Sequence, residues 1–398
     1  MTPRSFGLAL ALLGLALGSA RADDGAAAWR LFVSDHAEPV LSVIDAEAGA
    51  VIETLPLSAP ASLYAGETGR TVYAVQGRAG RVTAIASGIA VEDHGDHADL
   101  VLSPPRLTGF EVEGENPVHF VEHGGVWAAF FDDEGLARLF SDAEALSGEA
   151  GLRTVDAGVP HHGVVVPFGA HDLVSVPHPE DPTNLPVGIA ALDRDGNRVG
   201  EIAPCPELHG EAKSGTLVAF ACETGLLVAS AGGSAPRITH LPYAETLPEG
   251  KATTLLGGRG LQYFLGNYGA SGLVLIDPTE ADAFRHLALP ARRVHFTVDP
   301  VRPRFAYVAT EDGQLHRLDV IAGTILESLS LTEPYSMDGH WSDPRPRIAV
   351  AGEAIYLTDP REGRVLRVDA ETFVPEGEIA VGGAPFNIIA IGGSGRTH

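Results

Sequence analysis

The sequence predicts an all-β fold, a β-propeller of eight blades, with seven blades as the fallback. Short apolar runs alternate along the chain with turns rich in Gly, Pro, Asp and Asn, and the chain contains 47 Gly and 28 Pro. This pattern is typical of many short strands. A unit of successive strands also repeats, most clearly at 295–329 and 340–379. Most units are 41–47 residues long, the length of a four-stranded propeller blade, with starts near Ser62, His119, His162, His209, Thr254, His295, His340 and Phe386.

The two chain ends are expected to close the ring by sharing one blade. The last unit contains a single strand at 386–393, whereas residues 29–57 supply outer strands with no inner strand before them. A blade built from both ends leaves no open sheet edge. Residues 23–398 are therefore expected to form one domain.

The first 22 residues predict export from the cytoplasm. They combine a basic start at Arg4, an apolar run from Phe6 to Leu17, and an A-x-A cleavage site at residues 20–22. These are features of a secretory signal peptide, and the apolar run is too short to span a membrane. No later segment has the roughly 18 unbroken apolar residues of a transmembrane helix. We expect a protein without membrane insertion, in the periplasm if the cell is Gram-negative.

The charge of the chain favours cations and basic partners over nucleic acid. Its 27 Lys and Arg face 52 Asp and Glu, which gives a formal net charge of −25. An acidic surface repels nucleic acid and anionic membranes. An alternative stays open, in which the acidity only keeps an exported protein soluble.

The two cysteines, Cys205 and Cys222, are expected to form one structural disulfide. Two thiols cannot build a zinc site of four thiolates, and in an oxidising compartment they favour a disulfide. A hairpin turn centred near residues 213–214 would place the two cysteines opposite each other. Opposite residues have Cβ atoms about 4.5–5.5 Å apart, close to the spacing that a disulfide needs.

Histidines recur where the predicted blades begin. The first strand of each blade lines the central channel, so residues at one position in successive blades meet around the axis. His119, His162 and His209 hold this position in three consecutive blades, although the chain has only 16 His. Three imidazoles and a carboxylate could bind Zn²⁺. The alternative is that they only supply hydrogen bonds in a polar channel. Further candidates are His161, His123, His295, His340 and the carboxylate of Asp338.

A second histidine-rich segment, at 91–105, lengthens one of the units. The spacing from Ser62 to His119 is 57 residues, and the surplus falls on this segment, which has no apolar period. We expect a loop inserted at one face, a common place for function. It could cap an ion in the channel, or it could be an ordinary solvated loop; its candidate metal ligands are His94, Asp96, His97 and Asp99.

Signatures of other chemistry are missing from the sequence. It has no G-x-S-x-G elbow, P-loop, C-x-x-C-H haem attachment or dinucleotide fingerprint. Two alternatives to metal carriage remain. A channel metal could activate water in a lyase or hydrolase, or the histidines could fill the channel of a non-catalytic interaction scaffold. No obvious general base stands beside the candidate ligands, so we expect a protein that is not an enzyme, and a monomer.

The signal peptide, the repeat and two motifs resemble the AztD family of periplasmic zinc metallochaperones over essentially the whole mature chain. The motifs are HGDHADLVLSPP at 94–105 and NPVHFVEHGGVWAAFFDDEG at 116–135. The resemblance implies a β-propeller that binds Zn²⁺ and passes it directly to the AztC-type solute-binding protein of an ABC zinc importer. The loop histidines of the family match His94 and His97, and its channel histidine matches His119. His162 and His209 rest on the blade alignment alone.

Overall fold

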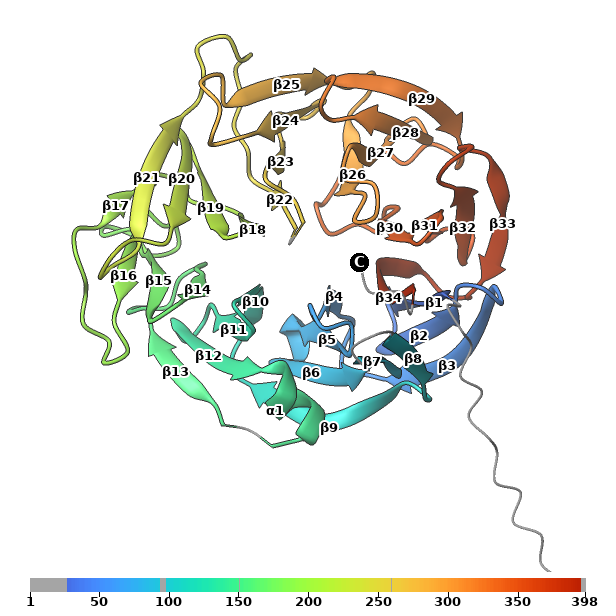
Figure 1. Ribbon diagram of the computed structural model, residues 1–398, viewed down its shortest axis with the longest axis horizontal. Helices are drawn as coiled ribbons and strands as arrows, with labels where there is room; N and C mark the ends of the chain where they lie inside the picture. Colours follow the sequence, from blue (N-terminus) through green and yellow to red (C-terminus); the bar gives the residue numbers. More distant parts are fainter. Residues whose placement is uncertain (1–26, 94–97, 150, 259, 395–398) are drawn as a thin grey trace, which may run out of the picture.

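The computed structural model describes residues 27–93, 98–149, 151–258 and 260–394. Within them, eight four-stranded sheets surround one axis as the blades of a propeller (Figure 1). This confirms the eight-bladed fold that the repeat predicts. The predicted signal peptide at 1–22 lies outside the described residues.

The strands of the first four blades are given from the axis outward. Blade 1 contains β34 (Pro385–Ser394), β1 (Ala27–Asp35), β2 (Val40–Asp45) and β3 (Ala50–Pro56). Blade 2 contains β4 (Ser62–Ala65), β5 (Thr71–Gln76), β6 (Arg81–Ala86) and β9 (Arg106–Glu113). Blade 3 contains β10 (Pro117–His123), β11 (Val126–Phe131), β12 (Leu136–Ser141) and β13 (Arg153–Asp156). Blade 4 contains β14 (Val165–Phe168), β15 (His171–Val176), β16 (Gly188–Leu192) and β17 (Ala203–Pro204).

The other four blades follow the same order. Blade 5 contains β18 (Glu211–Ser214), β19 (Leu217–Cys222), β20 (Gly225–Ser230) and β21 (Arg237–Pro242). Blade 6 contains β22 (Leu255–Leu256), β23 (Phe264–Asn267), β24 (Gly272–Ile276) and β25 (Phe284–Ala288). Blade 7 contains β26 (Arg293–Val298), β27 (Phe305–Thr310), β28 (Gln314–Asp319) and β29 (Thr324–Ser330). Blade 8 contains β30 (Ile348–Ala351), β31 (Ala354–Asp359), β32 (Arg364–Asp369) and β33 (Pro375–Ala380).

Three further elements complete the described chain. A short α-helix, α1 (Asp142–Ser147), follows β12, and a 3₁₀ turn, η1 (Gly77–Ala79), follows β5. A two-stranded hairpin, β7 (Ile89–Asp93) and β8 (Ala98–Leu102), is inserted between β6 and β9 of blade 2. None of the helical segments described is both long and apolar enough to cross a membrane.

Both chain ends meet in blade 1, as predicted. β1 pairs antiparallel with β34, and Phe32 lies opposite Ile389 while Leu31 lies opposite Ala390. Phe32 and Leu31 are fully buried, so apolar packing accompanies the hydrogen bonds of the closure. The shared blade removes the two edges that an open ring would expose.

Aspartates at strand ends explain why the turns recur along the sequence. Asp45 Oδ1 accepts hydrogen bonds from two backbone N–H groups in the turn after β2, and Asp319 does the same after β28. Each turn then needs a left-handed residue, which is Gly49 at φ +64° and Gly323 at φ +68°. The repeat of Asp and Gly in the sequence therefore records repeated turn geometry.

Large apolar side chains lock neighbouring blades together. Between blades 2 and 3, the rings of Phe120 and Trp127 stack with centroids 4.4 Å apart, and Tyr73 lies 4.8 Å from Trp127. All three side chains are buried. Burying one large apolar side chain contributes about 1.5–3 kcal/mol. This packing fixes β10, which carries His119, against blade 2.

The strand directions divide the propeller into two faces. Each inner strand begins at the end of the axis where the outermost strand of the preceding blade ends. We call this end the N-face and the opposite end the C-face. The β7–β8 hairpin joins the third and fourth strands of blade 2, so its base lies at the C-face.

One predicted blade start is wrong. The inner strand of blade 8 begins at Ile348, so His340 lies in the preceding loop and not at the start of the blade. Arg345 organises this loop, because its guanidinium donates hydrogen bonds to the backbone carbonyls of Ser336, Asp338 and His340. The loop is therefore an insertion that the spacing of the repeat concealed.

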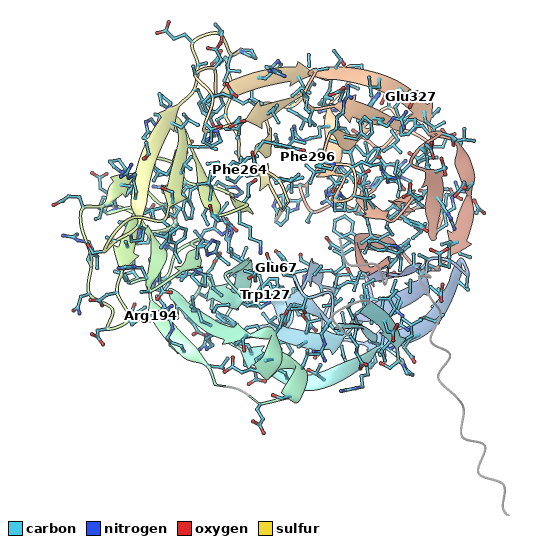
Figure 2. The ribbon with its side chains drawn as sticks, viewed as in Figure 1. Glu67, Trp127, Arg194, Phe264, Phe296 and Glu327 are labelled. Atoms are coloured by element: carbon cyan, nitrogen blue, oxygen red, sulfur yellow. A yellow bond between two sulfur atoms is a disulfide. The ribbon has the colours of Figure 1, made fainter. Side chains whose placement is uncertain are left out.

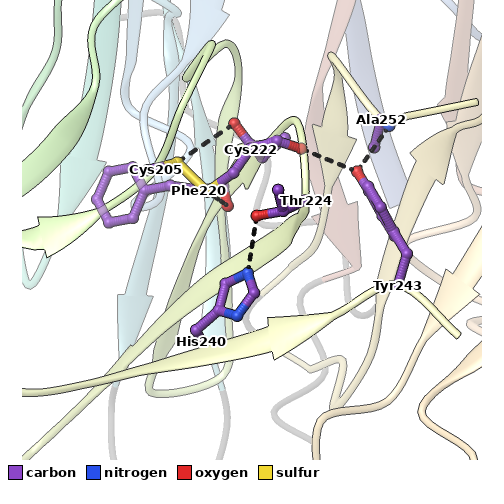
Figure 3. Close-up of a disulfide and its surroundings, with 8 residues drawn as sticks. Cys205, Phe220, Cys222, Thr224, His240, Tyr243 and Ala252 are labelled. Atoms are coloured by element: carbon purple, nitrogen blue, oxygen red, sulfur yellow. Dashed lines mark hydrogen bonds between the residues drawn. A yellow bond between two sulfur atoms is a disulfide. The ribbon is translucent and has the colours of Figure 1, made fainter.

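Cys205 and Cys222 form the predicted disulfide, with Cα atoms 5.0 Å apart (Figure 3). The hairpin register differs from the expectation, because Ser214 pairs with Leu217 and the turn therefore follows Ser214. Cys205 is not the strand partner of Cys222. It follows β17, so the bond ties the outer edge of blade 4 to β19 of blade 5. His209 lies between the two cysteines, and its segment is held at both ends.

Replacing both cysteines by serine is expected to lower the free energy of unfolding. The cross-link spans 17 residues, and closing a loop of this size in the unfolded chain is worth about 3 kcal/mol. Urea unfolding at neutral pH measures the change. A reductant should destabilise the wild type to a similar extent and leave the double variant unaffected. Equal sensitivity of both proteins to reductant would contradict the assignment.

Candidate metal centre

Three histidine side chains from three neighbouring blades meet at the N-face of the axis. His119 lies in β10, and His162 and His209 lie shortly before β14 and β18. Ring centroids are 4.7 Å apart for His119 and His162, 5.4 Å for His162 and His209, and 6.3 Å for His119 and His209. The blade alignment therefore predicted which side chains come together. We call these three residues the triad.

Each triad ring is held through its Nδ1 atom by an oxygen. The contacts are Glu211 Oε2 at 3.1 Å from His119, Asp132 Oδ2 at 2.7 Å from His162, and the Thr253 carbonyl oxygen at 2.9 Å from His209. Carbonyl and ionised carboxylate oxygens only accept hydrogen bonds, so a neutral ring carries its proton on Nδ1. Its Nε2 atom is then free to bind a metal. Metal-binding histidines commonly have such a second contact, which orients the ring.

Irregular backbone brings these rings to the axis. Asn116 adopts φ +57° just before β10, and the register of β10 shifts next to His119. Gly210 adopts φ +89° beside His209. A Cβ atom at Gly210 would collide with the Thr253 carbonyl oxygen that holds the His209 ring. Glycine is therefore needed at this position for close approach of the two segments.

The two carboxylates set the charge of the centre. Burial by itself lowers the pKa of His119, but the charge and hydrogen bond of Glu211, together with Asp132, outweigh it and raise that pKa. Burial raises the pKa of Glu211, yet the triad reverses this effect and lowers it. The pKa of His209 is lowered, first by burial and then by the charge on the other two rings. Negative charge beside imidazole nitrogen suits a divalent cation.

The distances between the triad rings are close to those of a tetrahedral zinc site. The Nε2 atoms of His119 and His162 are 3.2 Å apart. Two nitrogens bound at about 2.05 Å to a tetrahedral ion are about 3.3 Å apart, and their ring centroids are about 5 Å apart. His209 would therefore have to move by about 1 Å towards His119 to share the ion. Within the described ranges, no three His, Cys, Asp or Glu side chains already form a complete metal site.

The contact between the two Nε2 atoms of the triad depends on their protonation. Two Nε2 atoms that both carry lone pairs repel each other, whereas one proton between them makes a hydrogen bond. The raised pKa of His119 favours such a proton. A metal ion bound by both nitrogens would replace it.

Two alternate histidines have structural contacts instead. His161 is buried, and its ring nitrogens contact Ser175 Oγ at 2.9 Å and the Val159 carbonyl oxygen at 2.7 Å. His123 lies at the C-face end of β10 and stacks on Phe168 with centroids 5.0 Å apart. Burial lowers the pKa of both imidazoles. Neither ring joins the triad.

The candidates from blades 7 and 8 also lie apart from the triad. His295 Nδ1 accepts a hydrogen bond from the backbone N–H of Ile348. His340 lies in the loop before β30, and Asp338 of the same loop forms an exposed ion pair with Arg292. Asp338 is therefore not the carboxylate of the centre.

The hairpin ligands expected from 91–105 are separate from the triad in the topology. His94, Asp96 and His97 lie outside the described residues. Asp99 lies on β8 opposite Glu92 of β7. The base of this hairpin lies at the C-face, whereas the triad lies at the N-face, so the strand directions do not place it beside the triad.

Sequence reasoning missed the two carboxylates of the centre. Glu211 is the first residue of β18, two residues after His209. His209 precedes the strand and Gly210 between them adopts φ +89°, so the alternation of a strand does not connect the two side chains. Asp132 comes from the turn after β11 and has no signal in the sequence either.

An ion-pair network crosses the axis on the C-face side of the triad. Lys213, two residues beyond Glu211 on β18, pairs with Glu122 at the end of β10 and with Glu67 in the turn after β4. Figure 2 shows Glu67 close to the axis. The Glu122 side chain is only 3% exposed. Blades 2, 3 and 5 are thus joined near the axis, closer to the C-face than the triad is.

The chain is similar to known zinc chaperones over nearly its whole length. No protein-family model matches it. It is 51% identical over 387 residues to the zinc chaperone AztD of Citrobacter koseri, covering 97% of this chain and 92% of the relative. The crystal structure of that AztD has a TM-score of 0.91 at 51% identity, covering 94% of this chain and 100% of the other. The apo form has a TM-score of 0.89 at 50% identity, covering 93% and 100%.

A more distant likeness shows the fold alone. Dihydro-heme d1 dehydrogenase NirN has a TM-score of 0.60 at 15% identity, covering 90% of this chain and 74% of the other. At this identity, the shared propeller says nothing about shared chemistry.

Glu211→Gln is expected to weaken Zn²⁺ binding by about 10- to 100-fold, the usual effect of losing a contact that orients a ligand. It should also lower the pKa of the His119 imidazole, which histidine NMR titration of the metal-free protein measures. Affinity is measured by competition with a chromophoric chelator.

Glu207→Gln is the matched control. It removes the same charge from an exposed side chain paired with Lys251. The Zn²⁺ affinity and the pKa of His119 should both stay unchanged. Unchanged affinity in Glu211→Gln would show that the carboxylate does not position the ring.

Proposed function

Because this chain belongs to the AztD family of zinc chaperones, we propose that it binds Zn²⁺ on His119, His162 and His209 and passes it to another protein. The observation that carries the proposal is the convergence of three rings, each held at Nδ1 by an oxygen. Neutral imidazole bound in this way is a normal zinc ligand. Zn²⁺ is the cargo of this protein.

The acceptor we propose is the zinc-binding protein of an ABC importer, in the periplasm. The predicted signal peptide at 1–22 supports the compartment, and the resemblance to the family supports an AztC-type partner. Three protein ligands leave a fourth position open on a tetrahedral ion. A ligand of the acceptor could bind there, so that the ion passes to the acceptor by ligand exchange without entering solution.

The position of the triad supports one docking face. His119, His162 and His209 lie at or just before the starts of inner strands, at the N-face. On their C-face side, the ion-pair network of Lys213, Glu67 and Glu122 lies between the triad and the other end of the axis. We therefore place the docking of the acceptor at the N-face.

The hairpin at 91–105 is proposed as a separate zinc-capturing segment. Imidazole and carboxylate groups at His94, Asp96, His97 and Asp99 have the right chemistry for Zn²⁺. The C-face location of the hairpin base favours a role distinct from that of the triad.

The two alternative functions, an enzyme and an interaction scaffold, predict different behaviour. A lyase or hydrolase would need substrate turnover, and membership of a zinc chaperone family argues against it. A scaffold in which the histidines only fill the channel would bind no Zn²⁺.

Direct transfer is tested by mixing the zinc-loaded protein with metal-free zinc-binding protein of the AztC type. The rate should rise with acceptor concentration above the rate of spontaneous Zn²⁺ release, which is measured with a chelator. A rate that never exceeds spontaneous release would mean that the ion passes through solution.

The site is tested in the same assay with the double variant His119→Ala and His162→Ala. It should lose the tightly bound Zn²⁺ and have nothing to transfer. The control variant replaces His240 and His286 in the outer strands β21 and β25 by alanine. It should keep the bound Zn²⁺ and transfer it to the acceptor. Tight, stoichiometric Zn²⁺ in the first variant would overturn the assignment.

Zinc affinity is expected to fall as the pH decreases. Zn²⁺ competes with protons for Nε2, and the pKa of His119 is raised above its ordinary 6.5, so the loss should begin above that pH. Below it, each further proton that Zn²⁺ must displace lowers the affinity by about tenfold per pH unit. Competition titrations from about pH 8 to about pH 5.5 measure the profile. A flat profile would exclude histidine ligands.

A further inference from the structure

Arg347 is a cation at the N-face that has no acidic partner among the residues that the structure describes. It directly precedes the inner strand β30, and its backbone N–H donates to Thr358 Oγ1 at 2.8 Å. Its guanidinium lies 4.8 Å from the ring centroid of Phe386, which starts the neighbouring inner strand. Among the described residues, no protein oxygen accepts a hydrogen bond from this guanidinium. The side chain is half-buried, so a ligand can reach it.

Most other guanidinium groups of this acidic protein are satisfied. Within the loop before β30, Arg345 donates to four backbone carbonyls. Several arginines pair with buried carboxylates instead: Arg153 with Asp172, Arg302 with Asp299, Arg304 with Asp319 and Arg364 with Asp359. Arg347 departs from this pattern, although withdrawing a guanidinium from water is costly unless it is paired.

His295 lies beside the Arg347 segment, and Arg293 lies two residues before His295 on β26. His295 of β26 accepts the Ile348 N–H at Nδ1, so its neutral ring carries the proton on Nε2. Arg293 begins the same strand, and its guanidinium donates to two backbone carbonyls of blade 6, those of Gly269 and Gly272. Both strands start at the N-face. The neighbourhood therefore supplies N–H groups and positive charge, and no carboxylate is paired with either arginine in the described part of the chain.

The charge states agree with this geometry. Burial, with the nearby charge of Arg345, lowers the pKa of Arg347 to about 10, and burial lowers that of Arg293 to about 10. Both side chains stay cationic at neutral pH. Burial and the charges of Arg347 and Arg293 hold the pKa of His295 well below its ordinary value. His295 therefore stays neutral and can only donate from Nε2.

We propose that Arg347 and His295, near the positive charge of Arg293, form a binding site for a small oxyanion on the opposite side of the axis from the triad. A guanidinium fork matches the two oxygens of a carboxylate or phosphate group, and His295 can add a third hydrogen bond. The site lies in blades 7 and 8, whereas the triad lies in blades 3 to 5. It does not depend on the proposed zinc function.

Thermal unfolding of the metal-free, full-length mature protein tests the site. Sodium acetate or sodium phosphate replaces sodium chloride at constant ionic strength. The melting temperature should rise by roughly 2 °C or more and then saturate, because a ligand that binds only the folded state stabilises it. Saturation at lower acetate than phosphate concentration would identify a carboxylate ligand, and the reverse order a phosphate ligand. The absence of a saturable rise with both would overturn the proposal.

Arg347→Gln separates a binding site from a structural contact. With a ligand site, the variant should be at least as stable as the wild type in chloride, because an unpaired charge is removed, and its response to oxyanion should disappear. With a structural cation–π contact, the variant should lose stability and keep the response, which would overturn the proposal.

Arg361→Gln is the matched control. Arg361 also stacks on an aromatic ring, that of Tyr335, but it is exposed and donates to the Pro334 carbonyl oxygen. This variant should keep the full oxyanion response. If it lost the response as Arg347→Gln does, a general effect of surface charge would replace the proposed site.

Discussion

The pairing of β1 with β34 closes the ring, and the contacts at the axis depend on that closure. Blade 1 joins the two ends of the chain through the hydrogen bonds between β1 and β34, and no covalent cross-link connects these two strands. Once the ring is closed, apolar packing between neighbouring blades sets the angle between successive inner strands. The triad is sensitive to this angle, because its three rings come from three blades. A shift of about 1 Å separates its present spacing from that of a tetrahedral ion.

The triad combines ordered rings with incomplete geometry. Each Nδ1 atom is fixed by an oxygen, which sets the tautomer and orients the ring. His209 nevertheless stands farther from His119 than a tetrahedral site requires. A site of this kind can take up an ion with a small movement of one side chain, and reversing that movement releases it. This suits a protein that carries zinc better than one that stores it.

Charge is divided across the axis. Asp132 and Glu211 make one side negative, beside the triad, whereas Arg293 and Arg347 make the other side positive. A cation and an oxyanion would thus be held by different blades of the same ring. On the C-face side, the single positive charge of Lys213 is shared between Glu67 and Glu122.

Patterns in the sequence were enough to predict the propeller, the ring closure, the disulfide pair and the three histidines that converge. These features come from local patterns: turns such as those at Asp45 and Asp319 repeat at a fixed spacing, and the chain has only two cysteines. Three features became visible in the folded ring: the carboxylates that hold the triad, the position of His340 outside the inner strand, and the pairing of Lys213 with Glu67 across 146 residues. Local patterns depend on neighbouring residues, whereas contacts at the axis depend on the angle between blades. Packing around the whole ring sets that angle, and no single segment of the sequence contains it.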